Sequence, residues 1–148
     1  MKPQLLLVLA TGFLLAADDA ETPGKKELEK LEGTWTTAAL QYNGKDLAEK
    51  YKLKFVFKGD QASVEGNAAV KKEYAKILFK LDPSTTPCCV DMTIGAGVQK
   101  DAVIEGIYQL KDDELRICAR VFGKDRPLEF SSPEGSSIVL LVLKREKP

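Results

Sequence analysis

Hydrophobic and polar residues alternate with a period of two along most of the chain after Thr34. Between Ala75 and Leu81, for example, apolar side chains at odd positions are separated by Lys76 and Lys80. Successive side chains of a β-strand project to opposite faces, so this alternation is typical of antiparallel strands with one face in water. The pattern predicts eight strands, at residues 34–42, 52–58, 61–66, 73–81, 88–94, 101–110, 114–122 and 137–145.

Short turns separate the predicted strands. Asn43-Gly44, Gly59-Asp60 and Asp112-Asp113 are hairpin signals. A meander of eight antiparallel strands must hide two open edges, and closure into a barrel removes both. We therefore expect an all-β fold, an eight-stranded antiparallel up-and-down barrel whose interior is filled by side chains or holds one small ligand. A two-sheet sandwich is the alternative.

A short helical turn precedes the first strand. Thr22-Pro23 offers an N-cap followed by proline at the first helical position. Leu28 and Leu31 then lie three residues apart, which predicts one or two helical turns over residues 25–32. A second short helical turn is expected over residues 46–51.

Gly33-Thr34-Trp35, placed between this helical turn and the first strand, resembles the first-strand motif of lipocalins. The stretch from Leu28 to Glu146 is more closely similar to a bacterial, planctomycete-associated, lipocalin-like domain family of unknown function. The matching segments are residues 31–35, 57–60, 79–83, 106–108, 115–118, 126–130 and 143–145. The resemblance implies a lipocalin-like fold and an exported setting, but no established activity.

The same resemblance implies structural roles for three residues. Gly33 and Trp35 would close one end of the barrel, and Arg145 (or Lys144) from the last strand would lie across the indole. A guanidinium over an indole face stabilises by about 0.5–2 kcal/mol. If it is instead a solvated charge at the strand end, Arg145 has no such role.

The N-terminus has the features of an export signal. Lys2 is followed by an apolar run from Leu5 to Ala17, shorter than the ~20 residues that span a bilayer. We expect residues 1–17 to be a cleaved signal peptide, 18–27 a flexible leader and 28–146 the barrel domain, exported to the periplasm or the cell exterior. A buried N-terminal helix is the alternative. No other segment is apolar enough for a transmembrane helix.

The composition of the chain restricts the catalytic and binding functions that it can have. The chain has no histidine, and its 22 basic residues balance 22 acidic ones. The missing histidine excludes Ser-His-Asp and Cys-His catalysis and His-ligated zinc. The balanced charge offers no basic stripe for nucleic acid. We expect no metal site, no cofactor and no enzymatic activity, although carboxylate-pair or Ser-Lys chemistry stays open.

The three cysteines do not predict a disulfide. Adjacent Cys88 and Cys89 point to opposite faces of one strand. In a meander, Cys89 and Cys118 are separated by two strand spacings, about 9.6 Å, which exceeds the ~7 Å limit between the Cα atoms of a disulfide. We expect them to be small buried hydrophobic side chains.

The expected interior offers a candidate ligand site. The large side chains expected to face the inside of the barrel are Phe55, Phe57, Phe79, Ile104, Tyr108 and Ile117. They either line a pocket for a small hydrophobic or amphipathic ligand, or fill the barrel and leave no cavity. Arg116 and Arg120 are expected on the outer face. The alternative function is a protein-interaction or cell-envelope scaffold domain that uses loops 82–88 and 123–136.

Overall fold

The computed structural model describes residues 22–147, and nearly half of them lie in β-strands. The elements, in chain order, are α1 (Pro23–Leu31), β1 (Gly33–Tyr42), β2 (Lys45–Asp46), β3 (Lys54–Lys58), β4 (Gln61–Glu65), α2 (Ala68–Glu73), β5 (Ile77–Asp82), β6 (Cys88–Ile94), β7 (Val103–Lys111), β8 (Glu114–Arg120) and β9 (Ile138–Arg145).

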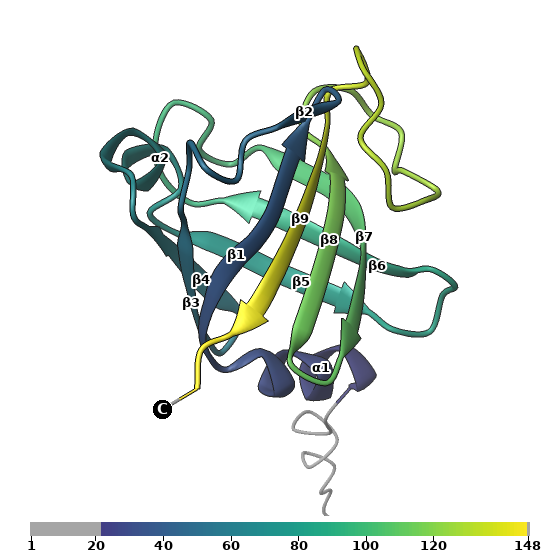
Figure 1. Cartoon of the computed structure of the whole chain (residues 1–148). Coiled ribbons are helices and arrows are strands. Elements are labelled where there is room, and N and C mark those ends of the chain that lie inside the picture. Colours follow the sequence, from purple (N-terminus) through teal and green to yellow (C-terminus); the bar gives the residue numbers. More distant parts are fainter. Residues whose placement is uncertain (1–21, 148) are drawn as a thin grey trace, which may run out of the picture.

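The strands form one antiparallel sheet that closes on itself (Figure 1). Their order is β2-β1-β3-β4-β5-β6-β7-β8-β9, and β1 also pairs with β9. Eight strands make the closed ring, while the two-residue β2 only extends the hairpin at Asn43-Gly44. The prediction of an eight-stranded, up-and-down, lipocalin-like barrel with a short N-terminal helix is confirmed.

The apolar residues of the alternating pattern face the inside of the barrel, and the polar residues face the outside. In β3, for example, Phe55 and Phe57 are buried while Lys54 and Lys58 are exposed. Gly106 allows β7 and β8 to approach closely, because a Cβ atom at this position would lie 2.5 Å from the backbone oxygen of Cys118. A larger residue would force the two strands apart at mid-barrel.

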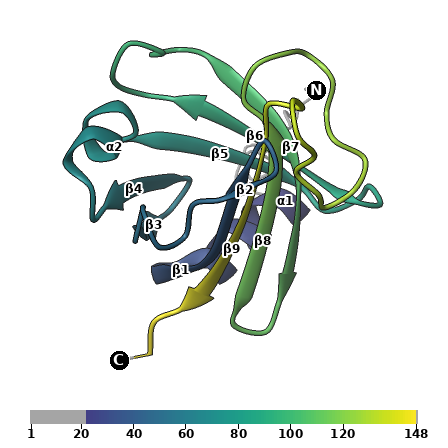
Figure 2. The same ribbon diagram turned by 45° about the horizontal axis from the view of Figure 1, so that its top comes forward.

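Helix α1 lies across one end of the barrel, the lower end in Figure 1 and the far end in Figure 2. The Thr22 hydroxyl caps it by accepting a hydrogen bond from the backbone N–H of Lys25 at 3.1 Å. Trp35 is fully buried beneath it, and its indole N–H donates to the carbonyl oxygen of Leu31 at 2.8 Å. The chain turns from α1 into β1 at Gly33, whose φ of 121° is readily available only to glycine.

A second, smaller apolar cluster lies outside the barrel. The connection from β8 to β9, residues 121–137, folds over the outer face of β7, β8 and β9 (Figure 1). It covers Ile107, Cys118 and Ile138, with Phe130 packed against them. The outer face of upper β9 is therefore covered.

The connections between strands agree with the expectation in one place and differ in another. Residues 47–51 form a single turn in which the N–H of Tyr51 donates to the oxygen of Leu47 at 2.9 Å, as expected, whereas the helix α2 at Ala68–Glu73 was not predicted. Asn67 caps α2 through its side-chain oxygen, which accepts from the N–H of Val70 at 3.1 Å. Because α2 occupies this stretch, β5 begins at Ile77 and not at residue 73. The predicted leader, residues 18–27, belongs to α1 from Pro23 onward.

Candidate ligand cavity

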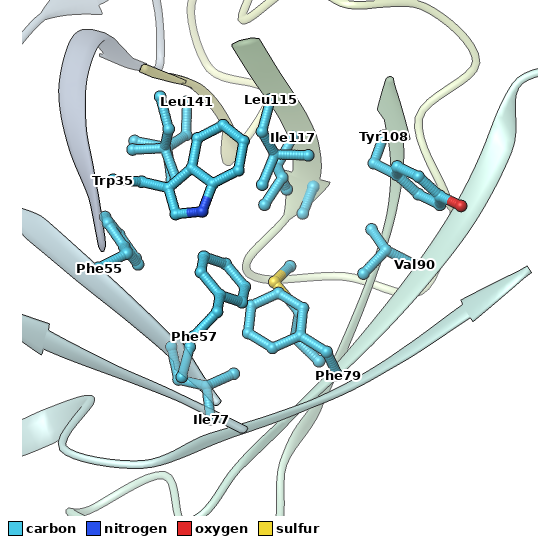
Figure 3. Close-up of a cluster of buried hydrophobic side chains, with 14 of the residues drawn as sticks. Trp35, Phe55, Phe57, Ile77, Phe79, Val90, Tyr108, Leu115, Ile117 and Leu141 are labelled. Carbon is cyan, nitrogen blue, oxygen red and sulfur yellow. The ribbon is translucent and has the colours of Figure 1, made fainter. Parts of the chain in front are cut away.

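The lower half of the barrel, next to α1, is tightly packed (Figure 3). The ring centroids of Phe57 and Phe79 lie 5.1 Å apart, and those of Trp35 and Phe57 lie 6.4 Å apart in an edge-on arrangement. Tyr108 and Ile117 are buried in the same core. Four of the residues expected to face the lumen (Phe57, Phe79, Tyr108 and Ile117) thus lie in the part of the barrel that side chains fill.

The Tyr108 hydroxyl points away from this core (Figure 3) and donates to Glu27 of α1 at 3.0 Å. Burial, with the Glu27 hydrogen bond and charge, raises the pKa of Tyr108 strongly. Burial also raises the pKa of the neighbouring Cys88 thiol. This contact fastens α1 to β7, so we assign it a structural role at the closed end.

The upper half of the barrel holds an apolar cavity of about 380 Å³. Two of the predicted luminal residues, Phe55 and Ile104, line it. The rest of its wall is almost entirely hydrophobic and is formed by Leu40, Tyr42, Leu47, Tyr51, Leu53, Val64, Val70, Tyr74, Ile77, Met92, Ile94, Gln99, Val121, Phe122, Val139 and Leu141. Cavities of roughly 300–1,000 Å³ with such walls are typical small-molecule sites.

The cavity lies where strand pairing ends. β4 and β5 pair only through Gln61 with Leu78 and through Ala62 with Ile77, whereas β5 and β6 pair along their whole length. The chain that leaves the short β4–β5 ladder forms α2, which lies at the upper end (Figure 1) and contributes Val70 and Tyr74 to the wall. The strands diverge there, so side chains from the connections border the space without filling it.

A similar gap occurs between β1 and β3. These strands pair only from Gly33 to Thr36, and segment 47–53 replaces β3 beside upper β1. The N–H of Leu47 donates to the oxygen of Leu40 at 2.7 Å, and the N–H of Thr37 donates to the oxygen of Leu53 at 3.1 Å. Segment 47–53 thereby forms part of the cavity wall.

Two connections meet at the mouth of the cavity. Glu73, at the end of α2, accepts a hydrogen bond from the backbone N–H of Val98 at 2.9 Å. Gly97 makes this approach possible, because a Cβ atom there would lie 2.5 Å from the Glu73 carboxylate. This contact, which we call the mouth clasp, joins α2 to the 95–102 loop. The side chain of Phe122, which lines the cavity, is 60% exposed.

Residues with polar side-chain groups are few in the cavity wall. They are Tyr42, Tyr51, Tyr74 and Gln99. Burial raises the pKa of Tyr74, and the nearby Glu73 and Tyr42 raise it further. The ammonium of Lys50 lies 5.3 Å from the centre of the Tyr51 ring.

The chain's arginines lie outside the cavity. Arg116 and Arg120 are on the outer face of β8, where Arg116 pairs with Glu114 at 2.8 Å. Arg126 pairs with Asp91 at 2.9 Å on the outer face of β6. Arg145 covers Trp35 at the closed end, with its Cζ atom 4.3 Å from the ring centroid. No arginine therefore reaches a ligand in this space.

Sequence alternation identified the strand residues of the interior and missed those in the connections. Val70 and Tyr74 lie four positions apart, as do Leu47 and Tyr51. This spacing places two side chains on one face of a helical turn, and it is the signal that could have assigned both pairs to the cavity. Gln99 and Phe122 lie in irregular loops and have no comparable signal.

Among residues 22–147, no group of three or more cysteine or carboxylate side chains is placed to hold a metal ion. All three cysteines, Cys88, Cys89 and Cys118, are free thiols. Within the same range no helix has the length and hydrophobicity needed to cross a membrane. The apolar cavity is thus the candidate site on which the functional argument rests.

Fold and cavity together define a closed lipocalin-like barrel with room for one small molecule at its upper end. Comparisons of the chain with protein-family models, with curated proteins and with solved structures give no match.

Proposed function

We propose that the chain is an exported carrier that holds one small apolar or amphipathic molecule in the upper half of its barrel. The apolar cavity of about 380 Å³ is the observation that carries this proposal. The packed lower half supports it, because Trp35, Phe57 and Phe79 are buried against one another there and do not enter the cavity wall. The exposed Phe122 at the mouth offers an apolar path for the ligand to enter.

The proposal of export rests on residues 1–17, which lie outside the described residues, and on the resemblance to a bacterial lipocalin-like family. We expect cleavage after Ala17 when the full chain is expressed in a bacterium. Intact-mass measurement of the secreted or periplasmic protein tests this. Recovery of the uncleaved chain from the cytoplasm would overturn export without touching the argument for the cavity.

Binding is tested with N-phenyl-1-naphthylamine, an uncharged aromatic probe whose fluorescence rises in apolar surroundings. We expect saturable binding at one site per chain. Replacing Ile104 by tryptophan places a larger ring in the cavity, and we expect it to weaken binding by at least about tenfold. Val103→Trp is the matched control, since the adjacent Val103 points out of the barrel.

The two variants separate cavity binding from binding at the surface. Unchanged folding of both is checked by thermal unfolding. Equal loss of probe binding in Ile104→Trp and Val103→Trp, or no saturable binding by the wild type, would rule out the carrier.

A protein-interaction domain is the second candidate. Leu128, on the 121–137 connection, favours it, because its residue surface is 85% exposed. An exposed large apolar side chain of this kind can contact a partner protein. An assay for partners in an extracytoplasmic extract distinguishes the two, with Leu128→Ser as the variant. Capture that is lost with Leu128→Ser but kept with Ile104→Trp would favour the interaction domain.

A further inference from the structure

The charge of the cavity wall restricts what the carrier can hold. None of the side chains that line the cavity is charged, and the lining residues with polar side-chain groups are three tyrosines and one glutamine. We infer that the ligand is an uncharged molecule with an apolar body and one polar group, and that Tyr42 and Tyr74 hydrogen-bond this group at the mouth. The inference rests on the proposed carrier function and specifies its ligand class.

An anionic ligand has no partner inside. A carboxylate moved into this wall would lose its hydration without gaining a cation, and an unpaired buried charge costs several kcal/mol. Arg120, the arginine closest in sequence to the cavity residues Val121 and Phe122, is engaged elsewhere. Its guanidinium donates to the backbone oxygens of Asp125 and Ser136, both at 2.8 Å.

A charge at the mouth gains little as well. Lys50 is exposed and lies over the Tyr51 ring. An ion pair with such an exposed ammonium contributes at most about 1 kcal/mol. A cationic ligand gains no more, because no carboxylate lines the cavity and the Glu73 carboxylate at its mouth already accepts the N–H of Val98. The mouth therefore favours a neutral polar group over either charge.

Tyr42 and Tyr74 are placed to bind one such group together. Tyr42 ends β1 and Tyr74 directly follows α2, and both elements reach the upper end of the barrel, where the cavity lies (Figure 1). The charge of Tyr42 is also among the causes that raise the pKa of Tyr74, which agrees with this placement. Both are half-buried and line the cavity. Burial keeps the Tyr74 hydroxyl protonated, and a phenol both donates and accepts hydrogen bonds. Alcohols, ketones and esters fit this pair.

The test compares ligands that share a chain length and differ in their polar group. Displacement of bound N-phenyl-1-naphthylamine is measured at neutral pH with decanol, methyl nonanoate, decanoate and decylamine. We expect the alcohol and the ester to bind at least about tenfold more tightly than either ion. Decanoate should gain affinity once acid protonates it.

Tyrosine variants test the anchoring pair. Tyr74→Phe and Tyr42→Phe should each weaken decanol binding by about three- to tenfold and leave the affinity for the probe unchanged. Tyr108→Phe is the control and should change neither, since the Tyr108 hydroxyl donates to Glu27 at the closed end and does not line the cavity. An equal loss in Tyr108→Phe would overturn the assignment of the pair.

The outcomes separate the inference from the function it rests on. Equal or tighter binding of decanoate or decylamine would overturn the uncharged ligand class and keep the carrier. Absence of saturable probe binding would overturn the carrier and this inference together.

Discussion

The guanidinium of Arg145 lies over the indole of Trp35, with its Cζ atom 4.3 Å from the ring centroid. The same side chain donates to the backbone oxygen of Glu32 at 2.7 Å and to that of Lys30, and it pairs with Asp113 at 3.1 Å. Arg145 thus joins the last strand to the end of α1 and to the β7–β8 turn. It shields the ring and satisfies carbonyl groups that a helix end leaves free.

We expect Arg145→Ala to lower the free energy of unfolding by roughly 2–3 kcal/mol, the sum of the cation–π contact and of charged hydrogen bonds. The control is Arg116→Ala, whose exposed pair with Glu114 contributes at most about 1 kcal/mol. Urea unfolding followed by Trp35 fluorescence measures both. Equal losses would mean that the Trp35 contact adds nothing beyond an exposed ion pair.

The two halves of the barrel should respond differently to the removal of an aromatic ring. Phe57 contacts aromatic rings on two sides, so Phe57→Ala should cost about 3–5 kcal/mol. Phe55 borders the cavity, and a ring with open space on one side has fewer packing contacts to lose. Phe55→Ala should therefore cost less, by at least about 1 kcal/mol in denaturant unfolding. Equal losses would indicate that the cavity is filled in solution.

This contrast also marks the limit of sequence reasoning for this chain. Alternation in segments such as Phe55 to Phe57 predicted the strands and the barrel, because a period of two has a single structural meaning. It could not tell that Phe57 packs against Trp35 while Phe55 faces open space. That difference depends on where the pairing between neighbouring strands ends. β4 and β5 pair through only two residue pairs, and the alternation of apolar and polar residues does not show how far two strands pair.

Stability should fall in alkali. Burial is the largest cause that raises the pKa of Cys88, Cys118, Tyr74 and Tyr108. The unfolded chain then loses these protons at a lower pH than the folded chain, so it binds fewer protons, and the free energy of unfolding decreases as pH rises. The stabilisation is complete below the unfolded pKa values and declines from about pH 9 upward.

Urea unfolding at a series of pH values, with reductant present, measures this decline. Tyr108→Phe removes one of the titrating groups and should flatten the slope above about pH 10, whatever its effect on stability at neutral pH. Lys111→Ala, an exposed change on the same strand, should leave the slope as it is. A flat profile in the wild type would contradict the burial of these four groups.

The mouth clasp should control how fast a ligand leaves. α2 is a six-residue helix with no fully buried side chain, so the hydrogen bond from Val98 to Glu73 is a main restraint on its position. Glu73→Ala removes the acceptor, and we expect release of N-phenyl-1-naphthylamine to become about three- to tenfold faster at a cost below about 1 kcal/mol in stability. Stopped-flow fluorescence measures the release.

Three further variants identify the cause of any change. Glu73→Gln keeps an acceptor oxygen and should behave like the wild type, and Lys72→Ala changes an exposed residue of α2 without touching the clasp. Gly97→Ala should reproduce Glu73→Ala, because its Cβ atom would occupy the position of the carboxylate and its φ of 81° disfavours alanine. Hydrogen exchange at the Val98 amide gives a readout without a ligand, and it should accelerate in Glu73→Ala and in Gly97→Ala. Unchanged exchange and release in both would show that the clasp does not hold the mouth.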